Sequence, residues 1–186
     1  MRLAIRKYGD PALRAKGKRI EAVDDEIRAL AGNMLETMHA ANGIGLAAQQ
    51  VGHALQLTVL DVTQVEDRPS TMALNGEPVA DLATAMPLVL INPTLRLSEA
   101  TELGSEGCLS FPEITADIER SIAIEMEAET LEGEQLRVEA SGLLARALQH
   151  EVDHLNGILF IDRMSSAAKA SHGSRLKRLQ KETAKM

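Results

Sequence analysis

The 186-residue sequence contains a single cysteine, and it has no long run of apolar residues at its N-terminus or elsewhere. One cysteine excludes an internal disulfide, so the composition gives no reason to expect an oxidising compartment. Without a long apolar run, the sequence lacks the pattern of a signal peptide and that of a bilayer-spanning helix. We therefore expect a cytoplasmic protein with no membrane partner.

An excess of positive charge is also absent. The formal net charge is −7 and the sequence pI is about 5.3, which argues against a broad nucleic-acid-binding surface. We therefore expect no DNA partner. The length predicts one domain over residues 1–186 with a substantial core, ending in a basic helix or tail over about residues 165–186.

The most informative stretch of the sequence is His150-Glu151-Val152-Asp153-His154. Residues i and i+4 share one face of a helix, so both imidazoles can reach one metal ion. Glu151 follows the first histidine and can take a proton from a water beside the metal. The pattern H-E-x-x-H is typical of zinc peptidases and their mechanistic relatives. The alternative is an amphipathic helix that carries two histidines without a metal.

The residues around this stretch favour a buried helix. Ser141 is a predicted N-cap, and Gly157 lies where a left-handed residue would end the helix. Buried imidazoles need partners for their nitrogen atoms, and a metal ion supplies one. Two adjacent stripes at helical spacing predict that most of the circumference is buried: Leu143, Ala147, His150 and His154, and Leu144, Leu148, Val152 and Leu155.

A catalytic zinc site needs a third protein ligand and an open position. Phe160 stands where one class of zinc peptidases has its third histidine, and neither Asp162 nor Glu182 is a convincing downstream substitute. The better candidate is Cys108, which we expect in an irregular loop because glycines and a proline surround it. A thiolate with two imidazoles suits Zn²⁺, Fe²⁺, Co²⁺ or Ni²⁺ rather than Mg²⁺ or Ca²⁺. The alternative is a buried cysteine without a ligand role.

A third segment with a recognisable chemistry is Gly43-Ile44-Gly45-Leu46-Ala47-Ala48-Gln49-Gln50-Val51-Gly52. Its small residues allow another backbone to approach closely, as when an extended peptide pairs with a strand edge. The Gln50 amide could donate a hydrogen bond to a developing oxyanion. The alternative is an ordinary glycine-rich loop between a helix and a strand.

The hydrophobic pattern predicts an α+β fold in which antiparallel sheets pack around a central metal-binding helix. A helix is expected over residues 24–41, capped by Asp24, with its methionines filling the core. Strands are expected over residues 55–62, 88–92, 122–128 and 135–140. Residues 62–87 are interpreted as a long surface loop.

Three segments together resemble the signature motifs of the peptide deformylase family, in the family's order. They are Gly43-Ile44-Gly45-Leu46-Ala47-Ala48-Gln49-Gln50, Glu106-Gly107-Cys108-Leu109-Ser110 and Gln149-His150-Glu151-Val152-Asp153-His154. The resemblance extends to Tyr8–Arg14 and Ile91–Pro93 and covers about residues 3–164. It implies an enzyme that removes the formyl group from the N-terminal formyl-methionine of newly made proteins and releases formate.

The resemblance also implies roles for individual residues and partners. Cys108, His150 and His154 would bind one divalent metal ion, Fe²⁺ in the cell and Zn²⁺, Ni²⁺ or Co²⁺ in some samples. Glu151 would be the general base and acid, and the Gln50 amide with the Leu109 N–H would hold the oxyanion. The implied partners are formyl-methionyl N-termini of nascent chains and, through the basic C-terminal segment, the ribosome. The residues implied in substrate binding are Gly43, Ile44, Gly45, Leu143 and Ala147.

The sequence departs from the family pattern in two places. Thr115 stands where many bacterial members have an arginine that reaches the substrate backbone, while Arg120 matches a second basic position. Residues 62–87 form a longer segment than is usual. Two other functions stay open at this point: a zinc endopeptidase, and a catalytically silent peptide-binding relative with a structural metal.

Overall fold

The computed structural model describes residues 1–185. Its helices are α1 (Asp25–Ala40), α2 (Gly142–Leu155) and α3 (Ser166–Thr183), with 3-10 turns η1 (Pro11–Arg14), η2 (Ala48–Val51), η3 (Leu82–Thr84) and η4 (Phe160–Arg163). Its strands are β1 (Gly45–Ala47), β2 (Leu57–Leu60), β3 (Ser70–Leu74), β4 (Glu77–Pro78), β5 (Leu88–Leu97), β6 (Thr101–Cys108), β7 (Phe111–Ser121), β8 (Ala123–Glu129) and β9 (Gln135–Ser141).

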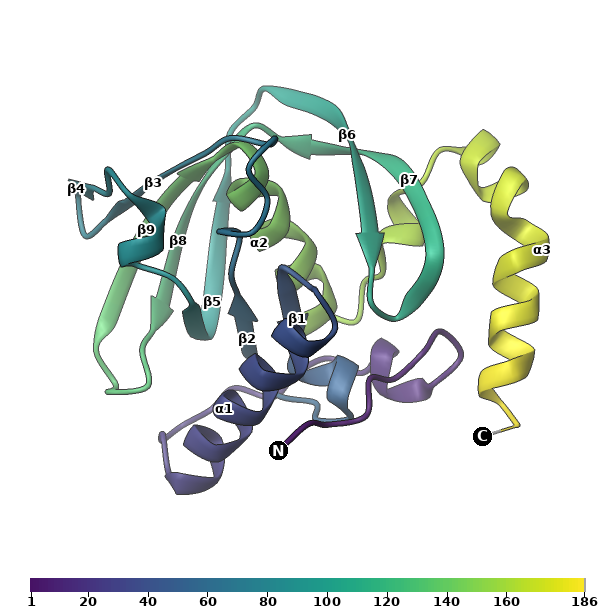
Figure 1. The fold of residues 1–186 in the computed structure, drawn as a ribbon, viewed down its shortest axis with the longest axis horizontal. Helices are drawn as coiled ribbons and strands as arrows, with labels where there is room; N and C mark the ends of the chain where they lie inside the picture. Colours follow the sequence, from purple (N-terminus) through teal and green to yellow (C-terminus); the bar gives the residue numbers. More distant parts are fainter. Residues whose placement is uncertain (186) are drawn as a thin grey trace.

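Two antiparallel sheets enclose α2 (Figure 1). The larger sheet has the strand order β1-β2-β5-β8-β9-β3-β4, and the smaller one is the β6-β7 hairpin. Helix α2 contacts β1, β2, β3, β5, β8 and β9 of the larger sheet and β7 of the smaller one. The predicted α+β class, with antiparallel sheets around a central helix, is confirmed.

Helix α1 forms as the sequence predicts. The Asp24 side chain accepts a hydrogen bond from the Ile27 N–H, so it caps the first turn. Met34 and Met38 are fully buried among apolar residues of β1 and β2. These methionines fill the core. Helix α1 thereby supports β1 and β2, and β1 is part of the Gly43–Gly52 segment, whose η2 turn contacts α2.

The prediction of a long loop over residues 62–87 is wrong. This segment contains β3, β4 and η3, and β3 pairs with β9 in the register Met72↔Ala140. Asn75 and Gly76 both have left-handed backbone angles, φ 50° and 85°, in the turn between β3 and β4. An Asn-Gly pair is the strongest local signal for such a hairpin, and the short strands around it bury little more than Met72.

The other predicted strands exist with altered limits. β2 is shorter than residues 55–62, while β5 runs on to Leu97 past a bulge at Asn92, whose φ is 52°. The bulge accommodates Pro93, which cannot donate a ladder hydrogen bond. β8 and β9 alternate as predicted, except that Ile122 lies before β8 and is 40% exposed.

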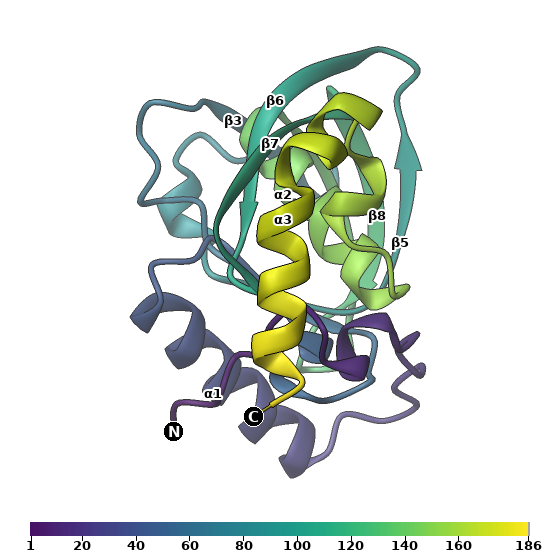
Figure 2. The ribbon, with the colours of Figure 1, turned by 90° about the vertical axis from the view of Figure 1, so that its right-hand side faces the viewer.

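Helix α3 follows η4 and runs along the outer side of β7 (Figure 2). Leu176 and Leu179 are half-buried and pack against a cluster that includes Phe111 and Phe160. Most of the exposed residues of α3 are polar or charged. Among the helices of residues 1–185, none has the length and apolar character needed to cross a membrane.

Candidate active site

Helix α2 holds the two histidines on one buried face. His150 and His154 are 8% and 1% exposed. The helix ends as predicted at Gly157, whose φ is +73°. Its N–H donates to the His154 carbonyl, and the next N–H, of Ile158, donates to the Asp153 carbonyl. This pair of bonds is a Schellman motif, which requires the left-handed residue that glycine supplies.

The start of α2 is capped by a different segment from the one predicted. Ser141 occupies the N-cap position, but its side chain makes no capping hydrogen bond. Instead the Leu143 N–H donates to the Pro69 carbonyl and the Leu144 N–H donates to the Ser70 hydroxyl. Pro69 and Ser70 therefore hold the N-terminal end of the helix, an arrangement that no local pattern around Ser141 reveals.

Cys108 lies at the end of β6, and Leu109 and Ser110 make the turn to β7. The expectation of an irregular loop is therefore wrong, although the pairing shifts register between Gly107 and Cys108. Gly107, which adjoins the shift, is the kind of residue found at such irregularities in a strand pair. A hairpin fixes the sulfur atom more firmly than a loop would.

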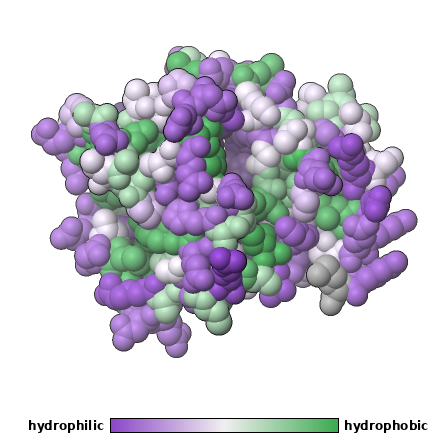
Figure 3. Space-filling view, viewed as in Figure 1, coloured by the Kyte–Doolittle hydropathy of each residue, from purple (hydrophilic) through white to green (hydrophobic). Residues whose placement is uncertain are grey.

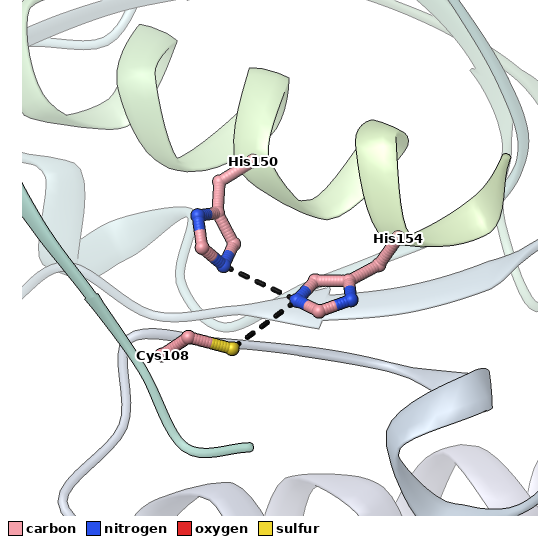
Figure 4. A group of neighbouring side chains, drawn as sticks. All are labelled: Cys108, His150 and His154. Carbon is pink, nitrogen blue, oxygen red and sulfur yellow. Dashed lines mark hydrogen bonds between the residues drawn. The ribbon is translucent and has the colours of Figure 1, made fainter. Parts of the chain in front are cut away.

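The three expected ligand atoms lie together (Figure 4). The Nε2 atoms of His150 and His154 are 3.2 Å apart, and the Cys108 Sγ atom is 3.3 Å from His154 Nε2. Tetrahedral ligation with bonds of about 2.1 Å to nitrogen and about 2.3 Å to sulfur would place such atoms roughly 3.4 and 3.6 Å apart. The arrangement therefore fits one metal ion, and its sulfur and nitrogen donors suit Zn²⁺ or Fe²⁺ rather than Mg²⁺.

Glu106 orients His150 from behind. Its carboxylate lies 2.9 Å from His150 Nδ1, which turns Nε2 toward the other ligands. Burial by itself would raise the pKa of Glu106, but His150 and Arg120 lower it to about 2. Burial would also lower the pKa of His150, yet the nearby Cys108 and Glu106 raise it well above its ordinary value. Burial and the His150 charge lower the pKa of His154 well below its ordinary value.

A buried network of charges surrounds Glu106. Arg120 donates to both oxygens of Glu106 and to Asp153, and Arg146 also reaches Glu106. Arg120, the residue that matches a second basic position of the family, is 4% exposed and does not line the cavity described below, so in this structure it serves the buried network. The sequence analysis gave Glu106, Arg146 and Asp153 no role. For Arg146 and Asp153 the sequence contained a usable signal: both are charged residues on a helix predicted to be mostly buried, where charges need partners.

Glu151 lies in the wall of the same site. It is 4% exposed, and its Oε2 atom has no hydrogen-bond partner among residues 1–185. Burial raises the pKa of this carboxyl to about 7, and the Glu106 charge adds to the shift. A Cβ at Gly45 would lie 2.8 Å from Glu151 Cδ, so only glycine leaves room for the carboxylate there. A buried carboxyl with a free oxygen is suited to proton transfer.

Gln50 points its amide toward the cysteine turn. The backbone N–H of Ala47 donates to Gln50 Oε1, which leaves the amide NH₂ facing the Ser110 hydroxyl at 3.2 Å and the Cys108 sulfur at 3.5 Å. Gln50 is 1% exposed and belongs to η2, directly after β1. The segment is thus a short strand followed by a 3-10 turn, and not an ordinary loop.

These groups surround a cavity of about 460 Å³. The face seen in Figure 3 is hollowed near its centre, with hydrophobic side chains around the hollow. β1 is the terminal strand of the large sheet, and β6 pairs with β7 alone among the strands of residues 1–185. Each of these two strands therefore has one edge without a partner strand there. The cavity lining includes ten of the eleven predicted site residues, all except His154: Gly43, Ile44, Gly45, Gln50, Cys108, Leu109, Leu143, Ala147, His150 and Glu151.

The downstream carboxylates that could have replaced Cys108 are engaged elsewhere. Asp162 pairs with Arg14, and Glu182 pairs with Arg178. Neither belongs to the group of potential ligand atoms found among residues 1–185. The ligand arrangement therefore differs from that expected of the zinc endopeptidase alternative. Thr115 lies in the cavity wall, as its position after the cysteine motif suggests.

Comparison with known proteins agrees with this geometry. The sequence model of the Polypeptide deformylase family matches residues 2–170. A peptide deformylase of Opitutus terrae is 45% identical over 186 residues, covering 98% of this chain and 95% of the relative. One of Rhizobium meliloti is 48% identical over 157 residues, covering 84% and 81%.

Solved structures give the same result. A plant peptide deformylase has a TM-score of 0.83 at 38% identity, covering 97% of this chain and 90% of that one. The enzyme of Thermotoga maritima has a TM-score of 0.75 at 39% identity, covering 89% and 99%. The chain belongs to the peptide deformylase family, hydrolases that depend on a metal and remove the formyl group from the N-termini of nascent proteins.

Proposed function

We propose that Cys108, His150 and His154 hold one divalent metal ion and that Glu151 moves the protons of deformylation. The observation that carries the proposal is the convergence of one sulfur and two imidazole nitrogens, with separations of 3.2 and 3.3 Å, beside the cavity that Cys108, His150 and Glu151 line. When bound, the metal would supply Lewis-acid chemistry, polarising the formyl carbonyl and making water more acidic.

Glu151 takes a proton from the attacking water as the new C–O bond forms on the formyl carbon. It then gives that proton to the departing nitrogen as the C–N bond breaks, which releases formate and a free amino terminus. Its burial supports this role, because a carboxyl with a pKa near neutrality both accepts and returns a proton.

The negative charge that develops on the formyl oxygen meets two donors of the chain, the Gln50 amide and the Leu109 N–H. Such donors stabilise the transition state most when they are already oriented in the free enzyme. The hydrogen bond from Ala47 to Gln50 Oε1 supports this assignment, because it fixes which end of the amide faces the site.

The nascent peptide lies extended between the free edges of β1 and β6. Gly45 has no side chain, so the peptide backbone can approach it closely. Ile44, Leu143 and Ala147 are apolar residues of the cavity wall and contact the methionine side chain, while Gly43, in the same wall, also contacts the substrate. A formyl carbon bears only hydrogen, so a closely fitted site excludes bulkier acyl groups.

Several further assignments belong to the same proposal. The metal is Fe²⁺ in the cell, with Zn²⁺, Ni²⁺ or Co²⁺ in other preparations, and a thiolate bound to Fe²⁺ calls for the reducing cytoplasm. Residues 1–186 work as one catalytic domain. The basic residues of α3 contact the ribosome: Lys169, Arg175, Lys177, Arg178 and Lys181.

Metal analysis beside a formate-release assay tests the proposal. Protein purified without oxygen should contain one metal per chain and release formate from a formyl-Met tripeptide, but not acetate from the acetyl-Met analogue. Chelation should abolish turnover, and Fe²⁺ should restore it. Turnover by metal-stripped protein, or hydrolysis of an internal peptide bond at a similar rate, would contradict the proposal.

A further inference from the structure

The N-terminal segment Arg6–Tyr8 connects η2 and the Leu109–Ser110 turn, to which the two proposed oxyanion donors belong. The Arg6 N–H donates to the Gln50 carbonyl at 2.7 Å, and the Tyr8 N–H donates to the Ser110 carbonyl at 3.0 Å. The Tyr8 ring also stacks on Phe111, with ring centroids 4.9 Å apart. One short stretch of backbone therefore ties η2 to the cysteine turn.

Lys7, between these two anchors, reaches the turn with its side chain. Its ammonium donates to the Leu109 carbonyl at 2.6 Å, across 102 positions of sequence, and the residue lines the cavity. Burial lowers the pKa of Lys7, and the nearby Cys108 sulfur partly opposes that shift.

The other two cations of the cavity wall have different partners. Arg146 donates to Glu106 and to carbonyls of β6 and β7, and Arg68 donates to the Ser105 carbonyl. Lys7 is therefore the cation of the cavity wall that contacts the turn following Cys108, within residues 1–185.

We propose that Lys7 is a positioning residue that fixes the Leu109–Ser110 turn and so orients the Leu109 N–H toward the developing oxyanion. The proposal rests on the function proposed above. A two-residue turn has few soft torsions, and here both of its carbonyls are held, one by Lys7 Nζ and one by the Tyr8 N–H. With both held, the preceding peptide group, which carries the Leu109 N–H, has little freedom left. Preorganised donors act on the transition state rather than on substrate binding.

Lys7→Met keeps most of the side-chain volume but removes the donor. With a formyl-Met tripeptide and metal-loaded enzyme, kcat should fall on the order of 10-fold while KM stays within about twofold, because small misplacements of catalytic groups cost rate. Metal content should not change, and Tm should move by no more than about 4 °C. Lys7→Arg, which still donates, should recover most of kcat. The control Lys16→Met, at an exposed lysine, should match the wild type.

A readout apart from activity is the hydrogen exchange of the turn amides. In Lys7→Met the Leu109 and Ser110 N–H groups should exchange faster, while the amides of α2 keep their wild-type rates. A double variant with Gln50→Ala should show non-additive losses of kcat, because both residues serve one oxyanion.

Unchanged kcat in Lys7→Met, or a raised KM with kcat intact, would overturn the proposal. So would a loss of kcat that follows a loss of metal. Full activity of Gln50→Ala would have a different meaning: it would remove Gln50 from the proposed function, and the Lys7 proposal would then be decided by the turn exchange and kcat of Lys7→Met.

Discussion

Helices α2 and α3 have similar lengths, 14 and 18 residues, but α2 buries twelve of its residues and α3 buries none. Both carry histidine, glutamate and arginine. On α2 these residues are buried, with Arg146 and His150 both contacting Glu106, whereas on α3 Arg178 and Glu182 form an exposed pair with side chains 82% and 58% exposed. The same residue types therefore have different energetic consequences on the two helices.

The difference arises from solvent rather than from secondary structure. A charge on α3 keeps its water, so removing it costs little. A charge on α2 has lost its water, so each one depends on a specific partner. Arg146 and His150 of α2 share such a partner in Glu106 of β6, which also pairs with Arg120 of β7. Matched substitutions on the two helices test this contrast.

The largest difference is expected for histidine. His154→Ala should lose both the metal and activity, because it removes one of three protein ligands, while His172→Ala on α3 should keep wild-type metal content and kcat. Metal analysis and formate release on the two purified proteins measure the contrast. Cys108→Ala should behave like His154→Ala. Full metal content and rate in either ligand variant would show that the ligand assignment is wrong.

Glutamate should give the next largest contrast. Glu151→Gln should retain the metal and lose about 10²–10⁴-fold in kcat, because the amide cannot accept a proton. Glu182→Gln, the matched change on α3, should leave kcat unaltered. Steady-state kinetics beside metal content separates loss of proton transfer from loss of the site. A rate for Glu151→Gln within threefold of wild type would point to another base.

The sequence was sufficient to predict what local spacing determines. The cap and apolar face of α1, the Gly157 terminus of α2 and the i, i+4 histidines are each encoded within a few residues, and all are confirmed. Spacing alone did not identify the third ligand. The expected third ligand, Cys108, lies 42 positions before His150, and the family resemblance supported that choice.

Long-range contacts account for what the sequence did not predict. The cap of α2 comes from Pro69 and Ser70, and the partners of Arg120 come from β6 and α2. No window around these residues contains their partners. The β3-β4 hairpin was different, because Asn75-Gly76 is a local signal that the interpretation as a loop overlooked.

Arginine should affect stability more than chemistry. Arg146→Met on α2 removes a donor from the buried Glu106 carboxylate and the buried Ile118 carbonyl, and from the Glu102 and Gly104 carbonyls. Breaking a buried ion pair costs about 3–5 kcal/mol. Denaturant unfolding of the two proteins should show that loss, while Arg178→Met on α3 should unfold like the wild type. A wild-type midpoint for Arg146→Met would contradict the buried-network argument.

The smallest effect should arise in η4, between the two helices. Asp162 pairs with Arg14 of η1, lies near Lys169 of α3 and accepts a hydrogen bond from the Leu159 N–H. Burial by itself would raise the pKa of Asp162, but these three contacts together lower it. A lowered folded-state pKa stabilises the protein above the unfolded value, about 3.9, and the contribution disappears as pH falls through the folded value. Because the pair is partly exposed, Asp162→Asn should lose less than about 1 kcal/mol at pH 7. Melting curves should show this deficit at pH 7 and its decrease below about pH 4, whereas Asp67→Asn, at an exposed site, should show neither. A deficit that stays constant down to pH 2 would assign the effect to packing rather than to charge.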